Sequence, residues 1–266
     1  MKRAAVLVYG ASGYTGRLTV EALLASGVEV VVAGRDAAKL EPLARSWGVP
    51  HRVFALDDPA AVRRGLAGSR LLLSAAGPFE ATTPALVRSC LESRVHYLDL
   101  GGEVRPLKLL ADLDGAARAR GILLLPSVGF DVVPSDCLAA HVARALPDAE
   151  ELVLGVQGSD LLSRGSALTF ADHAGRPLHV VRDGELEPLR FRTPLTYLDF
   201  GRGHRLCVAT SWGDLVTAPR TTGIRNVTVF FEATAIRLGG IAANQQLGPL
   251  LASPLARRWY RSVAER

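Results

Sequence analysis

The stretch Tyr9–Leu18, YGASGYTGRL, decides the fold because it places three glycines between an apolar run and a segment of helical periodicity. Residues 4–9 (AAVLVY) are apolar throughout, which is typical of a strand buried on both faces. Residues 15–27 carry apolar side chains at helical spacing, and Gly27 ends the segment. A strand, a glycine turn and a helix in this order predict the first βα unit of a nucleotide-binding sheet.

The same alternation continues through the first half of the chain. Asp36 and Asp58 stand where helix N-caps are expected, and Pro59 follows at a first helical position. Further strands are predicted at 28–34, 51–57, 69–77, 95–100 and 122–129, and further helices at 36–48, 58–68, 82–94 and 106–121. Alternating strands and helices predict an α/β fold, a Rossmann-type doubly wound parallel sheet.

The second half reads differently, as a smaller α+β domain. A helix at 134–146 leads into a strand at 150–158 and a loop and helix at 159–175. Short strands separated by turn signals follow at 177–181, 187–192, 204–212 and 226–236, and the tail 243–266 is helical with an interruption at Gly248-Pro249. We therefore expect a Rossmann domain at 1–135 and an α+β domain for substrate binding or dimerisation at 136–266.

Composition excludes several classes of protein. The net charge of +5 comes from scattered arginines, so nucleic-acid binding is not expected. No apolar run reaches the length of a membrane span, and the N-terminal run is too short for a signal peptide. The three cysteines, Cys90, Cys137 and Cys207, are far apart, which predicts neither disulfides nor a metal site and favours the cytoplasm.

The glycine turn is predicted to hold the pyrophosphate of a dinucleotide at the start of the first helix. Free N–H groups and a partial positive charge at a helix N-terminus stabilise phosphate without a charged side chain. The glycines of this turn follow the spacing GxxGxxG rather than the GxGxxG of the dinucleotide-binding fingerprint. Ala11 stands where that fingerprint has its first glycine. The expected cofactor-binding residues are Gly10, Ser12, Gly13, Tyr14, Thr15 and Gly16.

The end of the second strand favours NADP over NAD. Gly34 leaves space there, Arg35 follows, and Lys39 lies one helical turn on. A guanidinium suits bidentate recognition of the ribose 2′-phosphate. Asp36 could instead bind the ribose 2′-hydroxyl, as in NAD-binding proteins, although a role as helix N-cap also explains this residue. Asp57, after the third strand, is a candidate for the adenine edge or another helix cap.

The fourth strand ends in residues small enough for a flat cofactor to pass closely over the sheet. The candidate neighbours of the nicotinamide are Ala75, Ala76, Gly77 and Pro78. Tyr97, at the end of the fifth strand, is the first candidate proton donor, and Asp131, after the sixth, is the second candidate catalytic residue. A half-buried aromatic at a strand end is the alternative for Tyr97.

Candidate substrate residues come from the second half. SRGSALT could present Arg164, Gly165 and Ser166 as an anion cradle at a helix start, or form a simple cap. Trp212 lies in the stretch WGDLVTAPRTTGIRNV and is expected either to line the pocket or to tie the second domain together.

Together, GASGYTGRL, AGRDAAKL, AAGPF, HYLDLGGE, GFDVVPSD and WGDLVTAPRTTGIRNV resemble the saccharopine dehydrogenase-like NAD(P)-binding oxidoreductases. They are most similar to the branch with trans-acting enoyl reductases and saccharopine dehydrogenase-like oxidoreductases. The resemblance implies an NADP(H)-dependent enzyme that reduces a C=C, C=O or C=N bond of a small or carrier-linked metabolite. Relatives in this branch usually run longer, so the substrate pocket is expected to be smaller, completed by a partner, or degraded. A homodimer or a partner enzyme is left open.

Two alternatives remain. GASGYTG also resembles the loop of N-acetyl-γ-glutamyl-phosphate reductases and semialdehyde dehydrogenases, which would need Cys137 as a nucleophile. Its setting, PSDCLAAHV, instead predicts a buried cysteine on an apolar helix face. A non-catalytic NADP-binding sensor or partner subunit is the alternative outside enzymes.

Overall fold

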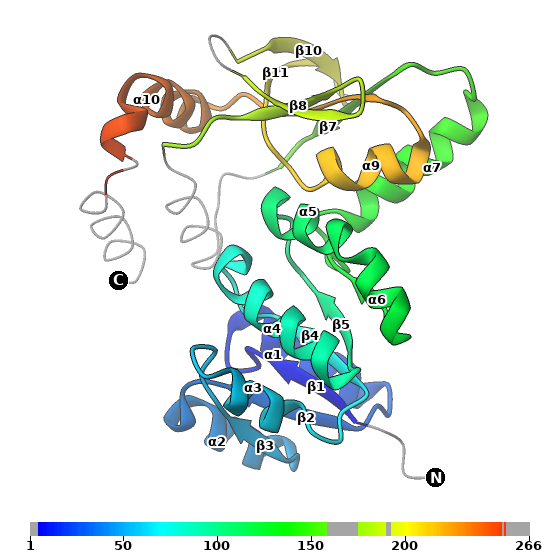
Figure 1. Ribbon diagram of the computed structural model, residues 1–266. Coiled ribbons are helices and arrows are strands. Elements are labelled where there is room, and N and C mark those ends of the chain that lie inside the picture. Colours follow the sequence, from blue (N-terminus) through cyan, green and yellow to red (C-terminus); the bar gives the residue numbers. More distant parts are fainter. Residues whose placement is uncertain (1–4, 159–174, 190–192, 252, 254–266) are drawn as a thin grey trace. The chain divides into compact units, whose positions relative to one another are not determined.

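The computed structural model describes residues 5–158, 175–189, 193–251 and 253 (Figure 1). The chain forms two compact units, residues 1–133 and 134–266, called here the N-terminal and C-terminal units.

The N-terminal unit is built on a six-stranded parallel sheet. Its strands are β1 (Val6–Tyr9), β2 (Val30–Gly34), β3 (His51–Val53), β4 (Leu71–Ser74), β5 (His96–Asp99) and β6 (Leu124–Leu125). They lie in the order β3-β2-β1-β4-β5-β6, so the direction of winding reverses between β1 and β4. This order confirms the predicted doubly wound sheet, whose ligands bind beyond the carboxyl ends of the strands at the reversal point.

Helices cover both faces of this sheet. They are α1 (Tyr14–Ala25), α2 (Ala37–Trp47), α3 (Pro59–Leu66), α4 (Phe79–Ser93), α5 (Val104–Asp112) and α6 (Asp114–Arg120). Alternate strand residues face opposite sides, so Val8 and Val32 pack with Val20 and Leu40 of α1 and α2. On the other face Leu7 belongs to the cluster that includes residues of α3 and α4.

Local sequence explains where two of these helices, α2 and α3, begin. Asp36 accepts a hydrogen bond from the Lys39 backbone, and Asp58 accepts one from the Ala60 backbone, so both predicted N-caps are confirmed. Two predictions were wrong in detail. The helix expected at 106–121 is two helices that meet at Leu113, and α4 begins at Phe79, three residues before the predicted start.

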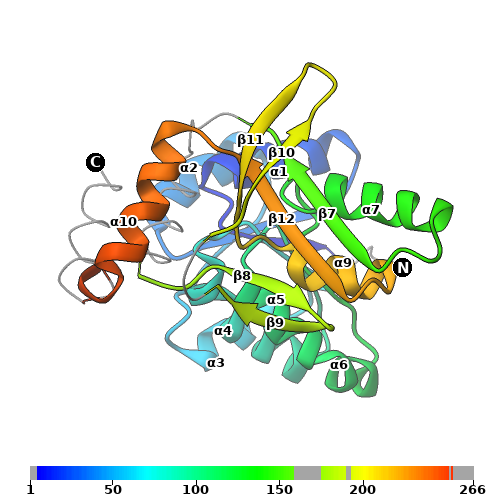
Figure 2. The same ribbon diagram turned by 90° about the horizontal axis from the view of Figure 1, so that it is seen from above.

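The C-terminal unit holds a mixed sheet in which β12 is central (Figure 2). It pairs in parallel with β7 and antiparallel with β11 and β8. The strands are β7 (Glu151–Val156), β8 (His179–Arg182), β9 (Glu185–Pro188), β10 (Leu195–Asp199), β11 (His204–Ala209) and β12 (Asn226–Glu232), with helices α7 (Val133–Ala145), α9 (Asp214–Thr222) and α10 (Ala235–Leu251).

The core of this unit lies between one face of the sheet and the helices α7 and α9. Ala139 of α7 and Leu215 of α9 belong to one cluster with Leu152, Val229 and Phe231 of the sheet. The strand β10 and the helix α9 were not predicted, and the strand expected at 226–236 ends at Glu232. In the described part of the chain, no helix is both long and apolar enough to cross a bilayer.

Candidate functional site: the carboxyl edge of the parallel sheet

The glycine turn between β1 and α1 lies at the reversal point of the parallel sheet. Gly10 has φ +85°, in the left-handed region that favours glycine. A Cβ on Gly10 would lie 2.9 Å from Ala75 and Ala76, and one on Gly16 would lie 2.2 Å from the carbonyl oxygen of Gly10. Gly10 therefore lets the turn contact the end of β4, and Gly16 lets α1 pack directly on the turn.

The helix α1 begins without a side-chain cap. Its N-cap residue is Gly13, and its first turn holds no acidic residue. The helices α2 and α3, in contrast, are capped by their own aspartates, Asp36 and Asp58. The first N–H groups of a helix have no intrahelical partner, so α1 is left to satisfy them with water or with a ligand. An anionic phosphate fits this end of α1.

Exposure of the turn agrees with such a role. Gly13, Tyr14 and Thr15 are exposed, and Ser12 is half-buried. The Nε of Arg17 donates to the Ser12 carbonyl oxygen at 3.1 Å, which holds a guanidinium beside the turn. Sequence reasoning missed Arg17, although a basic residue directly after the third glycine was a usable signal.

The candidates for the adenosine end lie near the phenol of Tyr9. Burial raises the pKa of Tyr9 to about 12, with smaller opposing effects of the nearby charges of Arg35 and Asp57. The structure thus brings together two predicted residues from the ends of β2 and β3. Arg35 is exposed, and Lys39 forms an exposed ion pair with Asp36 at 3.3 Å.

Gly34 is buried at the end of β2, and a Cβ added there would come no closer than 4.0 Å to the Leu40 side chain, so the fold itself does not require glycine at this position. The backbone hydrogen bond from Lys39 is the main cause that lowers the pKa of Asp36. This carboxylate therefore has two partners already, a helix end and a lysine.

The turn between β4 and α4 faces the glycine turn. Ala75, Ala76 and Pro78 are half-buried and Gly77 is exposed. The hydroxyl of Thr82 donates to the carbonyl oxygen of Ala76 at 2.7 Å. The predicted neighbours of the nicotinamide therefore adjoin the predicted phosphate seat.

Tyr97 lies in the interior rather than on the ligand edge. Its side chain is fully buried, its hydroxyl donates to Asp99 Oδ2 at 2.8 Å, and it shares a 3.1 Å hydrogen bond with Thr83. Burial and the charge of Asp99 hold the pKa of Tyr97 well above its ordinary value. This position argues against the proposed proton donor and favours a structural aromatic.

Asp131, the second catalytic candidate, is an exposed residue by its whole surface, but partial burial of its carboxyl group raises its pKa above the ordinary value. A Cβ on Gly102 would lie 3.0 Å from Asp131 Cβ, so the aspartate packs over the paired glycines that follow β5. Asp131 thus lies beside the segment 101–103, at the carboxyl end of β5.

In the C-terminal unit, Trp212 packs on Phe231, with ring centroids 4.8 Å apart, and belongs to the edge of the core. Arg164, Gly165 and Ser166 lie outside the described residues. Cys137 is exposed on α7, so the predicted burial of this cysteine was wrong. The described residues contain no cluster of His, Cys, Asp and Glu side chains that could hold a metal ion.

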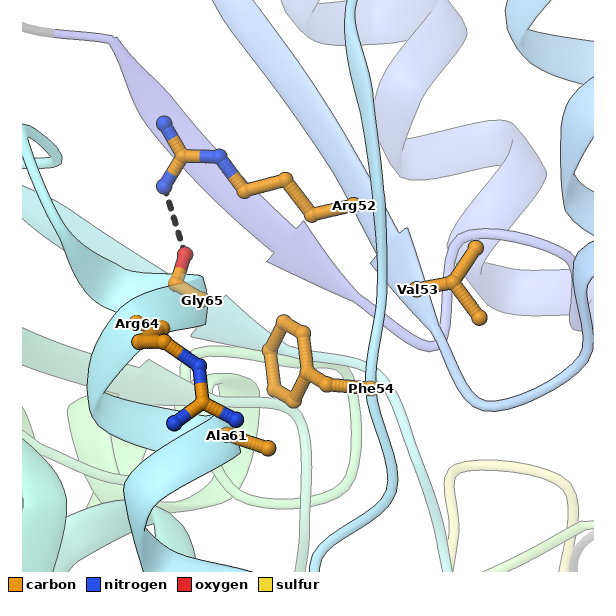
Figure 3. A pocket seen from close by; sticks show the side chains of 6 residues that line it. All are labelled: Arg52, Val53, Phe54, Ala61, Arg64 and Gly65. Atoms are coloured by element: carbon orange, nitrogen blue, oxygen red, sulfur yellow. Dashed lines mark hydrogen bonds between the residues drawn. The ribbon is translucent and has the colours of Figure 1, made fainter.

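A pocket on the outer part of the parallel sheet lies elsewhere (Figure 3). It is lined by Arg52, Val53, Phe54, Ala61, Arg64 and Gly65. Arg52 donates to the carbonyl oxygen of Gly65 and to the hydroxyl of Ser69, so its charge is already engaged. None of the predicted cofactor residues lines this pocket.

The sheet order and the glycine turn define a nucleotide-binding protein of the Rossmann class. Residues 6–121 match the family described as the saccharopine dehydrogenase NADP binding domain. The N-terminal unit is thus similar to the NADP-binding domain of the saccharopine dehydrogenases, and this match confirms the resemblance predicted from the sequence.

A trans-acting enoyl reductase of Mycobacterium leprae is 31% identical over 184 residues, covering 63% of this chain and 44% of that protein. A probable mitochondrial saccharopine dehydrogenase-like oxidoreductase of Arabidopsis thaliana is 28% identical over 211 residues, covering 71% of this chain and 46% of that protein. These matches span less than half the length of each relative.

Among solved structures, the apo saccharopine dehydrogenase (L-Glu forming) of Saccharomyces cerevisiae matches with a TM-score of 0.62 at 16% identity, covering 91% of this chain and 57% of that one. At this identity the match establishes the fold alone.

Proposed function

We propose that the chain is an NADP(H)-dependent oxidoreductase that reduces a C=C, C=O or C=N bond in a small or carrier-linked metabolite. The observation that carries this proposal is the uncapped start of α1 at the glycine turn, in contrast to α2 and α3, which are capped by their own aspartates. When bound, the dinucleotide would supply hydride, a chemistry that protein side chains lack.

The residues of the glycine turn would bind the pyrophosphate through backbone N–H groups and the partial charge of α1. Arg35 would pair with the 2′-phosphate, because its exposed guanidinium follows directly on β2 and has five donors. Lys39 would add charge while it keeps Asp36 neutralised. These roles favour NADP over NAD.

Of these three bond types we assign C=C, because a relative of 31% identity is named as an enoyl reductase. Asp131 is the residue that we assign to substrate binding or proton transfer, since it packs beside Gly102 at the carboxyl end of β5 and partial burial raises the pKa of its carboxyl group. Tyr97 is assigned to structure, because its hydroxyl is buried and bonded to Asp99.

Titration of the protein with NADPH and NADH, followed by nicotinamide fluorescence, tests the cofactor. We expect Arg35→Ala to weaken NADPH at least tenfold and NADH less than twofold, because loss of a charged phosphate contact costs more than about 1.4 kcal/mol. The matched control is Arg45→Ala, an exposed arginine in the last turn of α2. Equal losses for both cofactors with Arg35→Ala would contradict the 2′-phosphate assignment.

Turnover is tested with enoyl, carbonyl and imine substrates and NADPH. Oxidation of NADPH with one of them supports the enzyme. Tight NADPH binding without turnover on any class would favour the non-catalytic sensor or partner subunit. Loss of activity on alkylation of Cys137, which is exposed, would favour the semialdehyde dehydrogenase-like alternative.

A further inference from the structure

The segment that follows β5 carries a buried carboxylate whose partners lie on another helix. Glu103 is 6% exposed. Its Oε1 accepts a hydrogen bond from the Phe79 backbone N–H, and its Oε2 accepts one from the Glu80 backbone N–H, both at 2.8 Å. These N–H groups begin α4 and have no partner within the helix. Glu103 therefore caps α4 from a distant part of the chain, where its charge also meets the positive end of the helix dipole.

The cap holds the turn at residues 75–78, which joins β4 to α4. One side of this turn lies against Gly10, whose added Cβ would meet Ala75 and Ala76 at 2.9 Å. The other side continues directly into the two residues that Glu103 binds. The turn is thus fixed between the glycine turn and Glu103.

The segment that leads from β5 to Glu103 is held by a second buried carboxylate, that of Asp99. Asp99 Oδ1 accepts the backbone N–H groups of Gly101 at 3.0 Å and Ser127 at 2.9 Å, and Oδ2 accepts the Tyr97 hydroxyl. The Phe79 ring packs on Gly101, where an added Cβ would lie 2.7 Å from it. The ends of β4, β5 and β6 are therefore joined by hydrogen bonds and close packing.

We propose that Glu103 is a positioning residue for the nicotinamide half of the cofactor site. It touches no ligand; it sets the place of residues 75–78, over which a nicotinamide would lie. Since Glu103 occupies the N-terminus of α4, that helix end is closed to phosphate, which leaves α1 to hold the pyrophosphate. This inference rests on the proposed NADP(H) function.

The test compares two ligands that differ only at the nicotinamide end: NADPH, and 2′-phospho-ADP-ribose, which lacks nicotinamide. For Glu103→Ala we expect the Kd of NADPH to rise about tenfold, while the Kd of the fragment changes less than twofold. We also expect kcat to fall by about 10- to 100-fold, because a small misplacement of the reacting atoms slows the chemical step. The rise in KM should be smaller than this fall in kcat.

Glu103→Gln is the conservative variant. Its amide oxygen still accepts one N–H group, but its NH₂ group faces the other donor, so the effect should be intermediate. If Glu103→Ala does not fold, the same ligand pair is measured on Glu103→Gln. The matched control is Cys90→Ala, which removes a buried atom near the other end of α4 and should leave the ratio of the two Kd values unchanged.

If Glu103→Ala raised the Kd values of both ligands equally, or changed neither, the positioning role of Glu103 would be overturned while the NADP(H) function stayed intact. A wild-type protein that binds neither ligand would overturn the proposed function, and the positioning role with it.

Discussion

Each unit buries an aspartate, and the two aspartates have opposite surroundings. Asp99 of the N-terminal unit is 1% exposed and accepts three hydrogen bonds. Asp214 of the C-terminal unit is 0% exposed, and neither of its oxygens has a well-formed hydrogen bond in the described part of the chain. Burial raises the pKa of Asp214 to about 6, against a smaller opposing effect of the nearby Ser135 hydroxyl.

The difference shows two uses of a buried acid. Burial also raises the pKa of Asp99, but the donors from Ser127, Tyr97 and Gly101 partly offset it. That carboxylate joins strand ends. At Asp214 the Ser135 hydroxyl offsets less of the effect of burial, and Asp136 lies nearby as a like charge, so the charged form of Asp214 is poorly stabilised near neutral pH.

The largest effect is expected for Asp99→Ala. It leaves the N–H groups of Gly101 and Ser127 and the Tyr97 hydroxyl without their acceptor, each at about 1–3 kcal/mol. We expect the free energy of unfolding to fall by about 4 kcal/mol, measured by urea denaturation at pH 7.

The conservative variant Asp99→Asn sharpens this prediction. The amide oxygen can keep both backbone donors, and the amide NH₂ can donate to Tyr97, so a loss of about 1 kcal/mol is expected. Similar losses for the two variants would show that the hydrogen bonds of Asp99 do not hold the strand ends.

In contrast to the variants of Asp99, Asp214→Asn should raise the free energy of unfolding at pH 7. The folded pKa of about 6 exceeds the ordinary 3.8, so the folded state keeps a proton that the unfolded state has lost. Stability of the wild type therefore falls as pH rises from about 4 to about 6, by about 3 kcal/mol in all. Asparagine cannot ionise, so we expect a gain of up to about 3 kcal/mol at pH 7 and none at pH 4.

The control for Asp214→Asn is Asp112→Asn, which removes an exposed carboxylate paired with Lys108 and should change stability little at either pH. Urea denaturation of both variants across this pH range checks the sign. A destabilised Asp214→Asn at pH 7 would mean that the C-terminal unit does stabilise its buried charge.

The smallest effect is expected for Tyr97→Phe. It removes one hydroxyl that bonds Asp99 and Thr83, at a cost of about 1 kcal/mol, and should leave NADPH turnover within about twofold of wild type. Stopped-flow or steady-state assays measure the turnover. Loss of turnover with normal NADPH affinity and stability would restore Tyr97 as the proton donor.

The strands and helix caps that depend only on residues nearby in the sequence could be predicted. Continuous apolar runs gave the parallel strands, and Asp36 and Asp58 cap helices within three residues of themselves. The start of α4 could not be predicted in this way, because its cap, Glu103, lies 23 and 24 residues away from the N–H groups it binds.

Prediction also failed where tertiary packing decides the outcome. Tyr97 was predicted at the exposed end of a strand, but its hydroxyl is buried, where it bonds Asp99 two residues on in β5 and Thr83 of α4. The helix α9 contains Pro219 and several β-branched residues, which disfavour a helix in isolation. Burial of Leu215 and Ala218 in the core supplies the stabilisation that local sequence does not.

The central position of β12 has a consequence for synthesis on the ribosome. β7 pairs along β12 from Glu151 opposite Asn226, so these partners are made about 75 residues apart. Residues of the parallel sheet, in contrast, have all been made once β6 leaves the ribosome. At usual rates of about 5–20 residues per second, the N-terminal unit has several seconds to fold first. During that time β7 has been made but β12 has not, so the sheet of the C-terminal unit can be completed only after the parallel sheet.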